Sequence, residues 1–178
     1  MKIILIGYMG SGKTSIGKIL SNFIKKKFYD LDDIISNIYN ININNFFYIY
    51  GNFFFRILEN KILNYFLIKN YFKSYILSIG GGTPCYFNNM NLMNKLSNTI
   101  YLKNNKLSLY KRLLKNLYNR PLIKKLSYNN FFYFIINHIK KRNIIYKKSK
   151  YIIYTKNMSI KDTVNNVINV INNKCLIK

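Results

Sequence analysis

The segment at residues 7–14 constrains this chain most, because its sequence, GYMGSGKT, fits the pattern G-x-x-x-x-G-K-[ST] at every fixed position. An apolar run at residues 2–6, typical of a buried strand, precedes it, and apolar residues with helical spacing follow it at residues 14–26. Glycines in this setting let backbone N–H groups close around phosphate oxygens, and the helix N-terminus adds partial positive charge. The motif predicts a P-loop that binds a purine nucleoside triphosphate with Mg²⁺.

Two side chains of this P-loop are expected to carry its chemistry. Lys13 would reach the β- and γ-phosphates from an exposed loop, and the hydroxyl of Thr14 is placed to ligate Mg²⁺. Their neighbours in the motif are expected to contact the nucleotide as well, namely Gly10, Ser11, Gly12 and Ser15.

Beyond the P-loop, the apolar patterning alternates between short runs and helical periods. Strands are expected at residues 28–31, 75–79, 99–102 and 151–154, and helices at residues 33–39, 52–72, 106–117, 131–148 and 159–171. Asn40 suits a left-handed helix end, and Ser159 suits a helix N-cap. This alternation predicts an α/β fold: a P-loop three-layer domain with a five-stranded parallel sheet and helices on both faces. With no repeat or linker, residues 1–178 are expected to form one domain, and the polar segment 118–130 is expected to be a mobile lid.

The composition first suggests a nucleic-acid-binding protein, because 29 Lys and Arg face only 5 Asp and Glu, a net charge of +24. However, Lys, Asn and Ile, whose codons are rich in A and T, supply 84 of the 178 residues. Mutational drift toward A and T explains most lysines without selection for charge, so no specific nucleic acid is expected as a partner. A hydrophobic content of 49% excludes a disordered chain.

Cysteine usage and hydropathy narrow the class of protein further. Cys85 and Cys175 form neither a disulfide framework nor a metal-ligand pattern. No stretch of 18 apolar residues is free of charge or Asn, and the apolar run near residue 3 is too short for a signal peptide. We expect a cytoplasmic, monomeric protein that does not attach to membranes.

Residues that the chain keeps despite its biased composition mark the expected site. Three of the five acids fall within residues 30–33, at the expected end of the second strand. Because side chains at i and i+2 of a strand point the same way, Asp30 and Asp32 should face one crevice. One would hold Mg²⁺ through water and the other would receive or orient a hydroxyl, whereas Asp33 suits an exposed helix start.

Two further groups of scarce residues allow a functional and a plain interpretation. Arg56 and Glu59 share a helix face at i and i+3, which suits either a surface ion pair or an arginine clamp for a small carboxylate. Gly80–Gly82 follow an expected strand, where bare backbone N–H groups could meet a ligand or simply form a flexible loop. His138 is expected to be solvated or half-buried rather than catalytic, and the aromatic runs at 46–50 and 131–134 to be mainly core.

Taken in order, these motifs resemble the shikimate kinase family along the whole chain. They are the P-loop, Phe28-x-Asp30-x-Asp32, Gly51-x-x-x-Phe55-Arg56-x-x-Glu59, Gly80-Gly81-Gly82 and Arg120-Pro121-Leu122. The resemblance implies transfer of the ATP γ-phosphate to the 3-hydroxyl of shikimate, in the route to chorismate and aromatic amino acids. It assigns shikimate contacts to Asp32, Arg56, Glu59, Gly80, Gly81, Gly82 and Arg142.

The same resemblance implies the remaining roles. Lys13, Asp32 and Arg120 would be catalytic, with Arg120 in the closing lid, while Arg112 would stack on adenine and Thr14 and Asp30 would serve the Mg²⁺. The chain departs from the family in four places. Asn52 stands where the family usually has Glu, Asn40 replaces a glycine, the segment resembling R-x-P-x-Y reads RNIIY at residues 142–146, and the late proline that the family often has beside adenine is absent near Asn157. The alternatives are another small-molecule P-loop kinase, such as a gluconate or nucleoside monophosphate kinase, and a basic nucleic-acid-binding P-loop protein.

Overall fold

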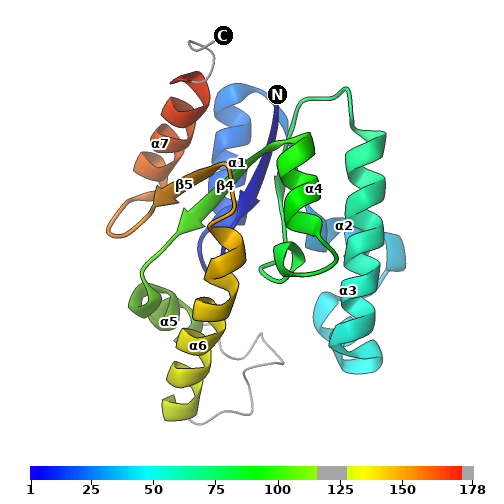
Figure 1. The fold of residues 1–178 in the computed structure, drawn as a ribbon, viewed down its shortest axis with the longest axis vertical. Helices are drawn as coiled ribbons and strands as arrows, with labels where there is room; N and C mark the ends of the chain where they lie inside the picture. The colour runs from blue at the N-terminus through cyan, green and yellow to red at the C-terminus, as the bar shows by residue number, and fades with distance from the viewer. Residues whose placement is uncertain (116–127, 174–178) are drawn as a thin grey trace.

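The computed structural model describes residues 1–115 and 128–173, and its centre is one parallel sheet (Figure 1). The sheet has five strands in the order β2-β3-β1-β4-β5, and every neighbouring pair is parallel. The strands are β1 (Lys2–Ile6), β2 (Lys27–Asp30), β3 (Tyr75–Ser78), β4 (Asn98–Lys103) and β5 (Tyr151–Tyr154). The predicted five-stranded parallel sheet is confirmed.

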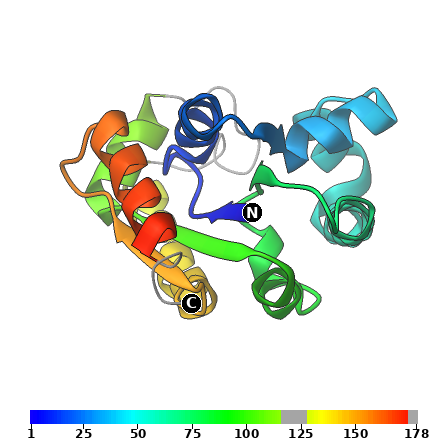
Figure 2. The same cartoon turned by 90° about the horizontal axis from the view of Figure 1, so that it is seen from above.

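Alternation along β1 explains the three layers. Ile3 and Leu5 point into a core shared with α1 (Lys13–Ile24) and α7 (Ile160–Asn173). Ile4 and Ile6 point to the opposite face, into the larger core formed with the remaining helices. Figure 2, seen from above, shows α1 and α7 on one side of the sheet and α4 and α6 on the other. The run Ile3–Ile6, apolar at every position, is therefore buried on both faces, as parallel sheets require.

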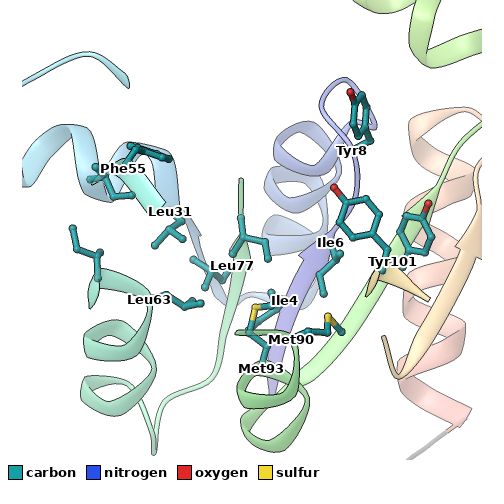
Figure 3. Packing of buried hydrophobic residues seen from close by; sticks show 14 of the residues in the cluster. Ile4, Ile6, Tyr8, Leu31, Phe55, Leu63, Leu77, Met90, Met93 and Tyr101 are labelled. Atoms are coloured by element: carbon teal, nitrogen blue, oxygen red, sulfur yellow. The ribbon is translucent and has the colours of Figure 1, made fainter. Parts of the chain in front are cut away.

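The larger core is covered by helices that the periodicity identified only in part. These are α2 (Leu31–Tyr39), α3 (Ile43–Lys69), α4 (Asn89–Leu96), α5 (Lys106–Leu114) and α6 (Tyr128–Tyr146), with a short 3-10 turn, η1, at Thr83–Cys85. No helix was predicted where α4 lies, yet Met90 and Met93 hold it against Ile4 (Figure 3). The long α3 also packs directly on the sheet, since the Phe66 ring lies 5.0 Å from that of Tyr29 in β2 and 5.1 Å from that of Tyr75 in β3.

One predicted boundary is confirmed and another was wrong. Helix α3 runs from Ile43 to Lys69 but is interrupted at Gly51, whose φ of 76° and ψ of 172° are not helical, so a helical segment begins after Gly51 as predicted, whereas the segment at residues 43–50 was not predicted. The predicted lid segment 118–130 ends inside α6, which already begins at Tyr128. Residues 118–127 of that prediction lie outside the described residues.

The two predicted helix caps, Asn40 and Ser159, are confirmed. Asn40 ends α2 with φ 48°, in the left-handed region. The Ser159 hydroxyl accepts a hydrogen bond from the Asp162 N–H at 3.1 Å, and the Asp162 carboxylate accepts one from the Ser159 N–H at 3.3 Å, which forms a capping box at the start of α7.

Parallel strands bring all five carboxyl ends to one edge of the sheet. In Figure 1, β1 leaves the N-terminus at the top and runs down toward the end of the molecule where α5 lies. Five segments therefore lie at the same edge of the sheet, where α/β proteins bind ligands. They are the P-loop, Asp30 at the end of β2, the Gly80–Gly82 loop, Asn104 and Thr155. Within residues 1–115 and 128–173, no helix has the length and hydropathy needed to cross a membrane.

Candidate active site

The P-loop lies between β1 and α1, as the motif predicts. Gly10 and Gly12 have φ values of 77° and 89°. The Lys13 amine donates hydrogen bonds to the carbonyl oxygens of Gly7 at 2.9 Å and Tyr8 at 3.1 Å. With only 9% of its surface exposed, Lys13 is buried, so the expectation of an exposed loop lysine was wrong. The loop curls around the amine and holds it at the start of α1, where phosphate oxygens bind in P-loops.

Thr14 and Asp30, the two predicted metal residues, lie next to each other. The Thr14 hydroxyl donates a hydrogen bond of 2.8 Å to Asp30 Oδ2. A hydroxyl and a carboxylate are the hard oxygen ligands that Mg²⁺ accepts directly or through water. The residues present at this position therefore fit the ion that the motif implies.

Asp30 and Asp32 do face one pocket, although the predicted reason was wrong. The strand ends at Asp30 and Leu31 already begins α2, so the pair is not an i, i+2 pair on a strand. Asp30 is the N-cap of α2, and its Oδ1 accepts a hydrogen bond from the Asp32 N–H at 3.1 Å. The cap turns both carboxylates toward a pocket of about 290 Å³, which is also lined by Lys13, Thr14, Gly80 and Gly81. Asp33, in contrast, is exposed, as expected.

Asp32 lies among four other charged side chains that shift its pKa. Burial raises the pKa of its carboxyl to about 7, and the nearby carboxylates of Asp30 and Glu59 push it in the same direction. Lys13 and Arg56 pull this pKa down. A carboxylate that titrates near neutral pH is suited to accept a proton from a hydroxyl.

Arg56 and Glu59 form a buried ion pair rather than a surface one. Arg56 Nη1 lies 2.6 Å from Glu59 Oε2, and the two residues are 6% and 1% exposed. The guanidinium also lies 5.1–5.6 Å from the ring centres of Phe47, Phe55 and Tyr86. Burial excludes the interpretation as a surface ion pair. Arg56 is instead a fixed, desolvated arginine at the edge of the sheet where ligands bind.

Asn52, where the family usually has Glu, also contacts this arginine. Its Oδ1 accepts a hydrogen bond of 3.3 Å from Arg56 Nε. The amide oxygen therefore holds the edge of the guanidinium without adding a second negative charge beside Glu59.

Close packing explains the glycines at positions 80 and 82. A Cβ atom at Gly80 would lie 2.6 Å from Glu59 Oε1 and 3.4 Å from Asp32 Oδ1, and one at Gly82 would lie 2.6 Å from both Nη atoms of Arg56. Any side chain would displace these charged groups, so the run is more than a flexible loop. It packs its backbone directly against the charged groups of the pocket.

Three residues that the sequence analysis missed support Glu59, namely the buried Thr83 and Asn89 and the partly buried Asn60. The Thr83 hydroxyl donates to Glu59 Oε1, and Asn89 Nδ2 donates to the Thr83 carbonyl at 2.9 Å. Asn60 Nδ2 in turn donates to Asn89 Oδ1 at 2.6 Å. Asn is so frequent in this chain that Asn60 and Asn89 gave no signal, and only the position of Thr83, directly after the glycines, could have pointed to it.

Arg142 reaches the same region from α6. A Cβ atom at Gly81 would lie 3.3 Å from Arg142 Nη1, and the guanidinium carbon lies 5.6 Å from the Tyr8 ring centre. One turn further along α6, the Tyr146 hydroxyl donates to the Gly81 carbonyl. Tyr8 and Tyr146 were not predicted as site residues, although Tyr8 is part of the P-loop and Tyr146 ends the RNIIY segment.

A second pocket, of about 500 Å³, adjoins the first across the P-loop. Gly10, Gly12 and Ser15 line both pockets. The second pocket is also lined by Ser11 and Arg112, and Arg112 Nη1 donates to the Gly10 carbonyl at 3.2 Å. Its far wall comes from Asn104, Thr155, Met158 and Thr163. None of the residues predicted for the acceptor lines the second pocket, whereas the first pocket brings Lys13 and Thr14 of the P-loop together with Asp32, Gly80 and Gly81.

The remaining predicted residues fall into three cases. Arg120 and Cys175 lie outside the described residues. Cys85 is partly buried, and burial raises the pKa of its thiol. His138 is half-buried, as expected, and shares a hydrogen bond with Tyr8. No group of three His, Cys, Asp or Glu residues able to hold a metal occurs in the part of the chain that the structure describes.

Comparisons with known proteins agree with this geometry. The family model described as Shikimate kinase matches residues 9–172. A protein of Azobacteroides pseudotrichonymphae genomovar. CFP2 named Shikimate kinase is 41% identical over 167 residues, which cover 94% of this chain and 97% of that protein. A protein of the same name from Flavobacterium psychrophilum is 38% identical, with 93% of this chain and 96% of that protein covered.

Solved structures extend the likeness to the whole fold. The crystal structure of shikimate kinase from Bacteroides thetaiotaomicron has a TM-score of 0.87 and 29% identity, covering 97% of this chain and 98% of that one. The Acinetobacter baumannii enzyme in complex with shikimate also has a TM-score of 0.87, at 25% identity, covering 97% of this chain and 93% of that one. The sequence, the fold and the arrangement of the pockets thus lead to one conclusion: this chain belongs to the shikimate kinase family.

Proposed function

We propose that this chain transfers the γ-phosphate of ATP to the 3-hydroxyl of shikimate, giving shikimate 3-phosphate and ADP for aromatic amino-acid biosynthesis. One observation carries the proposal: Asp32 lies close enough to Lys13 of the P-loop and to the buried Arg56–Glu59 pair for the charges of all three to shift its pKa. A carboxylate in that position can hold an acceptor hydroxyl while the acceptor's own carboxylate is bound by arginine.

The nucleotide half of the site is formed by the P-loop and the pocket beside it. Lys13 would exchange its bonds to the Gly7 and Tyr8 carbonyls for bonds to the β- and γ-phosphates. Arg112, which lines the larger pocket, would stack on the adenine there. The backbone of residues 10–15 would enclose the phosphates.

Mg²⁺ would be held by Thr14 and Asp30. Their 2.8 Å contact supports this assignment because the two oxygens already share one position beside the phosphate loop. When bound, the ion supplies positive charge that neutralises the transferring phosphoryl group.

The acceptor half uses charge recognition. Arg56 and Arg142 would bind the shikimate carboxylate, with Arg56 oriented by Glu59 at 2.6 Å. Backbone N–H groups of Gly80–Gly82 would contact the ring hydroxyls. Asp32 would orient the 3-hydroxyl and accept its proton as the phosphoryl group transfers, which its pKa of about 7 favours.

Arg120 and the lid remain predictions from the sequence. We assign residues 1–178 to a single P-loop kinase domain in which Arg120, carried by a lid at residues 118–127, would bind the phosphoryl group. Phosphoryl transfer depends on positioning and charge neutralisation, so an additional arginine beside Lys13 suits the reaction.

A coupled assay of ADP release, with and without shikimate, tests the proposal. We expect ADP release only with shikimate and Mg²⁺, together with a product heavier by one phosphoryl group in mass spectrometry. Gluconate and nucleoside monophosphates serve as competing acceptors. Turnover of one of these instead of shikimate would identify a different small-molecule kinase.

We also infer a cytoplasmic monomer that recognises no specific nucleic acid. The observation that speaks against a specific nucleic acid is that lysines occur throughout the sequence rather than in one stretch. Sedimentation velocity measures the oligomeric state, and cell fractionation measures the location. DNA binding that persists at about 300 mM salt would contradict the view that the charge has no specific partner, because non-specific binding collapses with salt.

A further inference from the structure

Helix α6 presents three polar residues of one face to the two loops of the site. His138, Arg142 and Tyr146 are spaced four apart, so they share that face. Tyr146 binds the Gly81 carbonyl, and Arg142 lies over the Tyr8 ring, with its guanidinium carbon 5.6 Å from the ring centre. The face therefore touches both the P-loop and the glycine loop.

Tyr8 is the P-loop residue that receives this face. Its side chain is 1% exposed, and its hydroxyl shares a hydrogen bond of 2.9 Å with His138 Nδ1. The two rings meet edge to face, with centres 5.6 Å apart, and Phe134 packs against the imidazole at 5.1 Å. These contacts fix the Tyr8 ring between His138 and Arg142, although Tyr8 and His138 lie 130 residues apart in the sequence.

The charges around the imidazole favour its neutral form. The pKa of His138 is lowered to about 4, mainly by burial and then by the positive charges of Arg142, Arg56 and Lys141. A neutral imidazole can hold the Tyr8 hydroxyl without placing a further positive charge beside the arginines. The aromatic face of Tyr8 then remains fixed where it attracts the Arg142 guanidinium.

We propose that Tyr8 and His138 are positioning residues that hold Arg142 ready for the carboxylate of the acceptor. This inference rests on the proposed function, because it needs an acceptor whose carboxylate Arg142 binds. Arg142 is only partly buried and carries a long side chain, so a fixed aromatic face reduces the conformational freedom lost on binding. The hydroxyl–imidazole bond fixes that face.

Two substitutions separate the hydroxyl from the ring. Tyr8→Phe keeps the ring beneath Arg142 and removes only the bond to His138, and we expect KM for shikimate to rise about three- to tenfold. Tyr8→Leu removes the ring as well and should raise it further. For both variants, kcat and KM for ATP should stay within about threefold of wild type, because the Tyr8 carbonyl and the P-loop backbone are retained.

His138→Leu provides an independent route to the same loss. It should reproduce the Tyr8→Phe effect, and the double variant should be no worse than either single one, because all three lack the same hydrogen bond. With shikimate methyl ester as the acceptor, Tyr8→Phe should change KM less than about twofold, because Arg142 then has no carboxylate to bind.

Tyr101→Phe is the matched control. The Tyr101 hydroxyl donates to Asn143 Oδ1 at 3.1 Å, so this variant also removes one bond between the protein body and α6, beside Arg142 but not through it. KM for shikimate should stay at the wild-type value in this variant. An equal rise in Tyr101→Phe, or an unchanged KM in Tyr8→Phe, would overturn the inference while leaving the proposed function intact. A wild-type protein that does not phosphorylate shikimate would overturn both.

Discussion

The Thr14 hydroxyl donates a 2.8 Å hydrogen bond to the Asp30 carboxylate, which joins the first turn of α1 to the last residue of β2. Because β3 lies between β1 and β2 in the sheet, this hydrogen bond crosses the carboxyl end of β3. It brings together the two residues proposed to hold Mg²⁺, and the adjacent pocket contains Lys13 and Asp32.

The first prediction separates the metal role of Asp30 from its helix cap. Asp30→Asn keeps an oxygen that can accept the Asp32 N–H bond but removes the negative charge, so the half-saturating Mg²⁺ concentration should rise about fivefold or more with little change in Tm. Asp30→Ala should show the same Mg²⁺ effect and also lose about 1 kcal/mol of stability. Titration of activity with Mg²⁺ and thermal unfolding measure the two effects. An unchanged Mg²⁺ requirement in Asp30→Asn would contradict the metal role.

The second prediction concerns Lys13. Lys13→Met should lower kcat at least about a hundredfold, because no other described side chain of the loop supplies positive charge to the phosphates. The fold should persist, since methionine fills similar space. The buried charge disappears together with the two hydrogen bonds to carbonyl oxygens that compensate it in the wild type. Circular dichroism and the coupled assay check both parts. Activity within about tenfold of wild type would contradict the P-loop role.

The third prediction places Asp32 on the acceptor side. Asp32→Asn should lower kcat far more than it weakens ATP binding, because the amide cannot accept the hydroxyl proton. Comparing kcat with Kd for an ATP analogue tests this. If the two effects were equal in size, Asp32 would belong to the metal site.

The fourth prediction uses the lowered pKa of His138. Its value of about 4 in the folded protein lies below the ordinary 6.5, so between these pH values the unfolded chain binds a proton that the folded chain does not. The contribution of His138 to stability should therefore fall as the pH falls from about 6.5 toward 4, while Asp32, whose pKa is raised to about 7, contributes in the opposite direction in both wild type and variant. His138→Gln lacks this titration, so its stability relative to wild type should improve steadily over that range. Urea unfolding at several pH values measures this, and a constant difference between the two proteins would contradict the shift.

The sequence predicted the sheet well because strong local signals coincided. Apolar runs that are buried on both faces mark β1 and β3, and the P-loop fixes the turn between β1 and α1. Asp30, Asp32, Arg56 and Glu59 stood out because acids and arginines are scarce in this chain. The same bias hid α4, whose sequence of Asn, Met, Leu and Lys has no distinctive helical pattern and is held by packing on the sheet.

Long-range contacts could not be predicted from the sequence. Nothing local connects Tyr8 with His138, or Thr83 with Glu59, because these contacts arise only when α6 and α3 pack beside the loops. The helical segment at residues 43–50, which precedes the kink at Gly51, was also missed from the sequence. The reason why Asp30 and Asp32 face one pocket was missed too. They are brought together by the N-cap at Asp30, where α2 begins, and not by the i, i+2 geometry of a strand.

The fifth prediction concerns the carboxylate clamp, the most substrate-specific part of the account, and compares two arginine-to-lysine substitutions. Arg56 lies in the acceptor half and Arg112 in the nucleotide half, and an ammonium cannot reproduce a bidentate guanidinium contact. Arg112→Lys, as the matched variant, should raise KM for ATP and leave KM for shikimate unchanged. Thermal unfolding of both variants checks that they remain folded.

KM for shikimate in Arg56→Lys decides whether this arginine recognises the acceptor. We expect a rise of about tenfold or more, with KM for ATP within about threefold of wild type. An unchanged KM for shikimate, in a variant that is folded and still binds ATP, would contradict the assignment of Arg56 as the residue that recognises the substrate carboxylate.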